Sequence, residues 1–224
     1  MTDDTTPESA TLSFADKMSY TDYLGLDHIL NAQNPLSSAH DVMLFIVQHQ
    51  ASELWLRLAI YELNAARDLI ANGDVRPAFK MLARVSRIFE QLNNAWDVLR
   101  TMTPSDYTTF REALGKSSGF QSYQYRHIEF ILGNRNTAMI RPHAHQPAVA
   151  KVLQSELENR SLYDVSLAAL NKTIALPAQV LNRNLSRPHA PNQSVADAWS
   201  QIYRDPKTHW ELYELAEKLI DLED

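Results

Sequence analysis

The sequence predicts an all-α fold, in which one helical bundle follows a short polar arm. Apolar residues recur every three to four positions over long stretches, as in amphipathic helices, and no stretch alternates apolar and polar residues as a half-buried strand does. Only 5 of the 224 residues are glycine, so little interrupts long helices. Short connections between the expected helices then favour a bundle.

The first elements are delimited by local signals. Residues 1–13 are polar and rich in Thr and Asp, which predicts a flexible N-terminal arm. A first helix is expected over residues 19–33, because Pro35 disfavours helix in the residue before it. A long second helix is expected over residues 40–72, with Gly73 as its C-terminal signal.

The third helix is expected over residues 74–99, and its apolar stripe is interpreted as core packing. That stripe consists of Phe79, Leu82, Ser86, Phe89, Leu92, Trp96 and Leu99. Thr103, Pro104 and Asp106 have the order of an N-cap, first helical position and capping box, so a helix should begin there. Further helices are expected over residues 121–132, 147–159, 162–174, 177–183, 195–204 and 207–224, with a loop over 185–192. Residues 14–224 are expected to form a single all-helical domain.

Composition excludes several classes of function. A net charge of −6 gives no basic excess that would attract a phosphate backbone, so no nucleic-acid partner is expected. No apolar run reaches the roughly 20 residues of a membrane helix, and the first residues lack the pattern of a signal peptide, so no membrane partner and a cytoplasmic location are expected. The chain has no cysteine, which rules out disulfides, thiolate catalysis and iron–sulfur clusters.

His49 is a candidate site residue because it lies inside an apolar helical run, Phe45–Gln50. Helical spacing places it on one stripe with Phe45, Ser52 and Leu56. The imidazole would then project beside an aromatic ring into a pocket. The alternative is an ordinary core histidine with satisfied hydrogen bonds.

Tyr107 and Arg111 form a second candidate group. They are one turn apart near a helix N-terminus, where a phenol and a guanidinium together suit a carboxylate. The alternative is a surface tyrosine stacked on an arginine. The loop 115–122 that follows is rich in small residues, which would let its backbone approach a ligand closely.

Together these stretches resemble the tryptophan 2,3-dioxygenase family, haem enzymes that open the indole ring of L-tryptophan with O2 to give N-formyl-L-kynurenine. The resemblance covers nearly all of the chain from Leu12 onward. The segments that carry it are Tyr20–Leu24, Leu26-Asp27, Phe45–Trp55, Thr103–Arg111 and Ser117–Asn134. It implies an all-α fold of the tryptophan/indoleamine dioxygenase type, a homotetramer and haem b as cofactor.

The resemblance also implies roles for particular residues. His49 would be the catalytic histidine above the iron, close to the indole N–H. The pocket wall against the indole would be formed by Phe45, Ile46, Val47, Gln48 and His49. Tyr107 and Arg111 would hold the substrate carboxylate, while Ser118 and Gly119 would lie along the haem. The element expected to reach a neighbouring subunit's active site consists of Tyr20, Tyr23 and Leu24.

No iron ligand is assigned, because the family's proximal histidine follows the point where this sequence stops, and a truncated C-terminus is therefore expected. His143 and His145 flank Ala144 in what is interpreted as an exposed loop, a weak candidate for metal binding. The sequence shows no partner pattern for His28, His40, His127, His189 or His209. No glutamate is followed by histidine three residues later, which excludes the usual di-iron motif of helical bundles.

Three functions remain open at this point. The first is the haem-dependent dioxygenase, in which haem supplies the oxygen chemistry and the protein orients tryptophan. The second is a haem-free homologue that binds an indole amino acid or regulates an intact relative. The third is a structural subunit in which the His49 helix is only core.

Overall fold

The computed structural model describes residues 17–222, and every regular element in this range is a helix, which confirms the all-α prediction. The expected arm over residues 1–13 lies outside the described residues. The α-helices are α1 (Tyr20–Leu24), α2 (Leu26–Leu30), α3 (Val42–Asn72), α4 (Val75–Leu99), α5 (Pro104–Arg111), α6 (Tyr123–Leu132), α7 (Pro147–Glu158), α8 (Leu162–Asn171), α9 (Ala178–Leu181), α10 (Gln193–Arg204) and α11 (Trp210–Ile220). Two 3-10 helices are η1 (Gly119–Gln121) and η2 (Thr137–His143).

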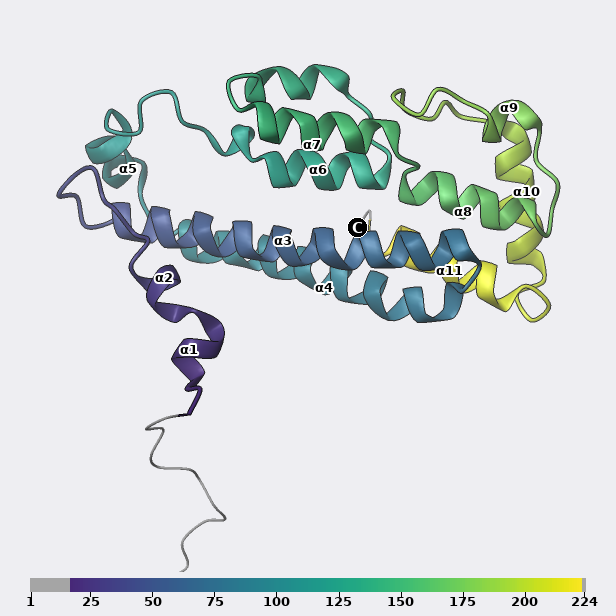
Figure 1. Ribbon diagram of the computed structural model, residues 1–224, viewed down its shortest axis with the longest axis horizontal. Helices are drawn as coiled ribbons and strands as arrows, with labels where there is room; N and C mark the ends of the chain where they lie inside the picture. The colour runs from purple at the N-terminus through teal and green to yellow at the C-terminus, as the bar shows by residue number, and fades with distance from the viewer. Residues whose placement is uncertain (1–16, 223–224) are drawn as a thin grey trace, which may run out of the picture.

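The antiparallel pair α3 and α4 forms the long axis of the molecule (Figure 1). Gly73 joins them with φ 88°, a left-handed conformation that glycine adopts without strain. Ala59 and Ala66 on α3 and Ala78 on α4 are fully buried. Small side chains let the two helices approach closely along their length.

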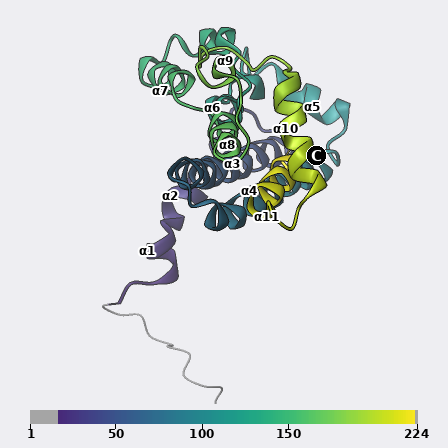
Figure 2. The same cartoon turned by 90° about the vertical axis from the view of Figure 1, so that its right-hand side faces the viewer.

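A second layer lies across α3. Helices α6, α7 and α8 lie on one side of the α3–α4 pair, and α11 packs beside α4 (Figures 1 and 2). The core between them holds large side chains with no solvent exposure, among them Leu63, Leu82 and Leu170. Burying each such side chain contributes roughly 1.5–3 kcal/mol, so this interface holds the layers together.

Buried ion pairs also connect the elements. Glu156 on α7 accepts from Arg67 on α3 and lies 3.3 Å from His127 Nε2 on α6. Asp164 on α8 accepts from Arg183 at 2.8 and 2.9 Å and lies 2.9 Å from His189 Nε2. The sequence interpretation, which found no partners for these two histidines, was wrong because both partners are distant in sequence.

His143 was also misinterpreted as part of an exposed loop. It ends η2 and is only 3% exposed, and burial lowers the pKa of its imidazole. His145, by contrast, is exposed. Pro142 precedes His143 and suggests a loop, but a 3-10 turn accommodates it here.

The single helix expected over residues 19–33 is instead two short ones, α1 and α2. Gly25 separates them with φ 60°, a conformation that ends one helix and starts the next. Both project away from the bundle (Figure 1). The other α-helices lie close to their expected positions, but α8 ends at Asn171 rather than at residue 174, and α11 spans Trp210–Ile220 rather than residues 207–224. The 3-10 helices η1 and η2 were not predicted. No helix between residues 17 and 222 has the length and hydropathy needed to cross a bilayer.

We expect Asp164→Asn to destabilise the fold by about 3–5 kcal/mol at pH 7, because it removes one partner of a buried ion pair. Burial alone would raise the pKa of Asp164, but hydrogen bonds from His189 and Arg183 outweigh it and hold that pKa well below its usual range. The stabilisation is therefore complete above the unfolded pKa of about 3.9 and is lost as the pH falls toward the folded pKa. Urea unfolding at several pH values would measure the free energy of unfolding of wild type and of Asp164→Asn. The difference between these two free energies should become smaller below about pH 4.

The matched control is Asp97→Asn, which removes an exposed ion pair with Arg100 on α4. Such pairs contribute about 1 kcal/mol or less. If Asp164→Asn lowered the free energy of unfolding by no more than Asp97→Asn does, a structural role for the buried pair would be contradicted.

Candidate active site

Helices α3 and α5 bring four aromatic rings together. The Phe45 ring centroid lies 4.1 Å from that of His49 and 5.7 Å from that of Phe110. Tyr107 adds its ring at 6.3 Å from Phe45 and 5.5 Å from Phe110. Local sequence explains the position of α5, because Thr103 and Asp106 form the expected capping box at its start. This aromatic cluster therefore joins two segments separated by more than fifty residues.

The His49 ring is oriented by its own helix. Its Nδ1 lies 2.7 Å from the backbone carbonyl oxygen of Phe45, one turn earlier. A carbonyl oxygen only accepts hydrogen bonds, so Nδ1 carries the hydrogen and Nε2 of the neutral ring is an acceptor. His49 is thus prepared to accept a hydrogen bond from a ligand N–H.

A cavity of about 770 Å³ opens beside His49. Leu56 on α3, Trp96 on α4 and Phe120 in η1 form apolar parts of its wall. Ser52 and Glu53 line the same face of α3 as His49, as helical spacing predicts. Trp96 is 54% exposed, so its interpretation as core packing was wrong. The cavity falls in the size range of small-molecule and cofactor sites.

Arg126 lines the cavity but was not among the candidate site residues predicted from the sequence. Its guanidinium lies 4.6 Å from the centroid of Phe120 and 5.0 Å from that of Tyr125, and it forms an ion pair with Glu129 at 2.6 Å. Its Nε is buried without a hydrogen-bond partner among the described residues. The signal available in the sequence was its place in the matching segment Ser117–Asn134.

Gln124 fixes α6 against α3 at the edge of this cavity. Its side-chain amide donates at 2.8 Å both to the backbone carbonyl and to the carboxylate of Glu53. Gln124 is buried, and its two bonds fix the register between the helices that carry His49 and Arg126.

The other predicted pocket residues are placed differently. Gln48 and Gly119 line the cavity, while Val47 is 47% exposed and Ile46 is half-buried. Ser118 does not line it; its hydroxyl accepts from the backbone N–H of Phe120 and so caps η1.

Tyr107 and Arg111 are not among the residues that line the cavity. Tyr107 packs in the aromatic cluster. Arg111 is exposed and donates to the backbone carbonyl of Gly115 at 2.7 Å, which ties α5 to the following turn. Their role as a carboxylate clamp stays a prediction.

The N-terminal residues predicted to reach a neighbour are exposed. Tyr20 is 75%, Tyr23 77% and Leu24 40% accessible, and α1 extends away from the body of the chain (Figure 1). Within one chain, these three residues are therefore not brought to the cavity.

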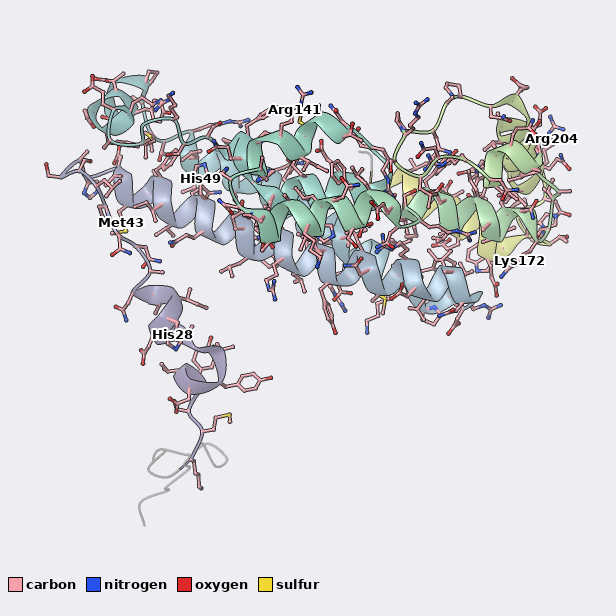
Figure 3. All side chains as sticks on the ribbon, turned by 45° about the horizontal axis from the view of Figure 1, so that its top comes forward. His28, Met43, His49, Arg141, Lys172 and Arg204 are labelled. Carbon is pink, nitrogen blue, oxygen red and sulfur yellow. The ribbon has the colours of Figure 1, made fainter. Side chains whose placement is uncertain are left out.

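The described residues contain no group of three or more His, Asp or Glu side chains arranged to hold a metal ion. His49 is the histidine on the wall of this cavity (Figure 3).

The cavity is enclosed by helices, has an aromatic wall and contains one oriented histidine, which are features of a site for a small molecule or cofactor. Comparison with known proteins identifies the family. The family model for tryptophan 2,3-dioxygenase matches residues 5–197. The tryptophan 2,3-dioxygenase of Bradyrhizobium diazoefficiens is 61% identical over 222 residues, covering 99% of this chain and 80% of the relative. That of Ruegeria pomeroyi is 60% identical over 223 residues, with the same two shares.

The chain belongs to the tryptophan 2,3-dioxygenase family. The match spans the segments that carry His49, Tyr107 and Arg126. The family resemblance inferred from the sequence is confirmed.

We expect neutral His49 to be the Nδ1–H tautomer, because Phe45 offers it only an acceptor. Long-range ¹⁵N–¹H NMR spectra of ring-labelled protein would show which nitrogen carries the hydrogen. His40, which is exposed, serves as the internal reference. An Nε2–H signal for His49 would contradict the orientation described here.

Proposed function

We propose that this protein is a haem-dependent dioxygenase that cleaves the indole ring of L-tryptophan with O2 to give N-formyl-L-kynurenine. In this reaction the C2–C3 bond of the indole breaks, and both oxygen atoms enter the product. The observation that supports the proposal most directly is the oriented His49 on the wall of a cofactor-sized cavity, within a segment shared with the family. The relatives are named as enzymes, which favours this function over a haem-free binding protein.

The residues of the cavity suit haem b. Trp96, Phe120 and Leu99 offer apolar surface for a porphyrin, and the cavity volume of about 770 Å³ is sufficient. Arg126 would pair with a porphyrin carboxylate, which would also give its buried Nε a partner. Haem supplies the binding and activation of O2 when it is present.

His49 and its neighbours would orient the indole. The acceptor Nε2 of His49 would take the hydrogen bond from the indole N–H. Phe45, whose ring is 4.1 Å from that of His49, would pack against the indole face. Gln48 lines the cavity and would extend this wall, while Ile46 and Val47, the other predicted wall residues, lie on other faces of the same turn of α3. These contacts position the ring bond that is cleaved.

Arg111 and Tyr107 would hold the substrate carboxylate. The Arg111 guanidinium now donates to a neutral carbonyl, that of Gly115. Exchanging it for a carboxylate would replace a neutral acceptor by a charged one, which forms a stronger hydrogen bond. Gly119 on the cavity wall, together with Ser118, would bring backbone close to the haem and the substrate amino group.

The exposed N-terminal element fits a homotetramer. Tyr20, Tyr23 and Leu24 place apolar surface in solvent at the end of a projecting segment. In an oligomer they would be covered by a neighbouring subunit and would complete its active site. We further propose that the protein works in the cytoplasm, since a chain without cysteine has no need of an oxidising compartment.

The function is tested by titrating the protein with haemin, reducing it, and assaying L-tryptophan turnover to N-formyl-L-kynurenine. We expect saturable one-to-one haem binding and a Soret spectrum that shifts on adding L-tryptophan. If the protein neither bound haem nor formed N-formyl-L-kynurenine, the proposal would be overturned. A haem complex whose spectrum ignores L-tryptophan would contradict the assigned substrate.

We expect His49→Ala to lower kcat/KM for L-tryptophan by about 10- to 100-fold, the equivalent of one or two lost positioning interactions. His40→Ala, at an exposed histidine just before α3, should leave kcat/KM unchanged. Steady-state kinetics on the two variants check this. Full turnover with unchanged KM in His49→Ala would contradict the role given to His49.

We expect Arg111→Lys to raise KM for L-tryptophan about tenfold or more with a smaller effect on kcat, because lysine lacks the planar fork that binds a carboxylate through two hydrogen bonds. Arg204→Lys, at the far end of the molecule (Figure 3), is the matched control. Tryptamine lacks the carboxylate, so its KM should be the same for wild type and Arg111→Lys. Equal KM values for L-tryptophan in the two proteins would contradict the clamp.

A further inference from the structure

A second cleft lies between the segment that follows α6 and the loop that follows α9. It measures about 520 Å³ and is lined by residues 134–137 on one side and by residues 184 and 186–188 on the other. It shares no residue with the cavity beside His49. Its wall contains two arginines and no acidic residue, although the chain as a whole carries a net charge of −6.

Arg135 in this wall is a buried cation that forms no ion pair with a carboxylate of residues 17–222. It is only 2% exposed, and its guanidinium donates to two backbone carbonyls, those of Glu156 and Asn159. Its Nε has no hydrogen-bond partner among the described residues. Burial lowers the pKa of Arg135, as expected for a charge that is incompletely compensated.

The neighbouring carboxylates are already engaged. Glu156 pairs with Arg67 and lies beside His127. The carboxylate of Asp164 pairs with Arg183 and His189. The positive charge of Arg135 is therefore not neutralised by a direct contact, which is costly in a buried position.

The remaining wall of the cleft offers hydrogen-bond donors. The side-chain oxygen of Asn136 accepts from the backbone N–H of Ala138, and that of Asn184 accepts from the N–H of Ser186. These bonds leave both amide NH2 groups available as donors. Arg187 is exposed and forms no ion pair with any residue between 17 and 222.

The loop that carries Arg187 is held in place. Arg183 donates to the backbone carbonyls of Asn184 and Arg187 while it binds Asp164 in the interior. The backbone that carries Asn184 and Arg187 is thereby held in place before any ligand arrives, which lowers the entropy cost of binding.

We propose that this cleft binds a small oxyanion of the phosphate type, either free or as the phosphate group of a small metabolite. Arg187 would contact the anion directly, the amides of Asn136 and Asn184 would donate to its oxygens, and Arg135 would contribute its uncompensated charge from beneath. The ligand would bind independently of the tryptophan site.

The proposal is tested by isothermal titration of the 224-residue chain with inorganic phosphate at constant ionic strength. We expect one saturable site, and a Kd at least tenfold higher in Arg187→Gln than in wild type. Arg141→Gln removes an exposed arginine on η2 outside the cleft (Figure 3) and should leave Kd unchanged. Circular dichroism would confirm that both variants are folded.

The outcomes separate the possible sources of the anion. Tighter binding of glucose 6-phosphate than of phosphate would assign the cleft to a phosphorylated metabolite, and equal binding would assign it to the free ion. Absence of saturable binding, an equal Kd in Arg187→Gln, or equal loss in both variants would overturn the proposal. Chloride at the same ionic strength should produce no saturable signal.

Discussion

Close packing of α4 along α3 is the contact on which the rest of the structure depends. Fully buried alanines, including Ala59 and Ala78, let the two helices approach, and large residues such as Leu63 and Leu82 fill the space beside them. Protein interiors are packed at high density, so the path of α4 along α3 decides which part of the α3 surface remains accessible to solvent or a ligand. The N-terminal part of α3 is left less buried than its centre, and the cavity lies there.

The candidate active site is a consequence of this arrangement. Phe45 and His49 lie toward the N-terminal end of α3, where α5 adds Tyr107 and Phe110 instead of a core helix. Gln124 then fixes α6 beside Glu53, which brings Arg126 to the opposite wall. One rigid helix thus provides both the centre of the core and the wall of a ligand pocket, so its register controls both.

Buried charges organise the part of the molecule around the junction of α7 and α8. The pairs Glu156–Arg67 and Asp164–Arg183 connect helices and a loop, and they engage the carboxylates that could otherwise neutralise Arg135. The same network that anchors the loop at residues 183–187 therefore leaves a positive cleft beside it. The same arrangement of charges therefore stabilises the fold through ion pairs and leaves the cleft lined by Arg135 and Arg187 positive.

The sequence by itself determined the helical class, most helix positions and the family, because periodicity, caps and turn residues act over a few positions. The capping box of Thr103 and Asp106 and the left-handed Gly73 are such local signals. The sequence also identified His49 as a polar ring in an apolar helix. Tertiary structure decided what no local pattern contains: that Trp96 faces a cavity, that Arg126 reaches its wall, and that His143 is buried. These properties depend on which distant helix covers each side chain, and that is set by packing between segments far apart in the chain.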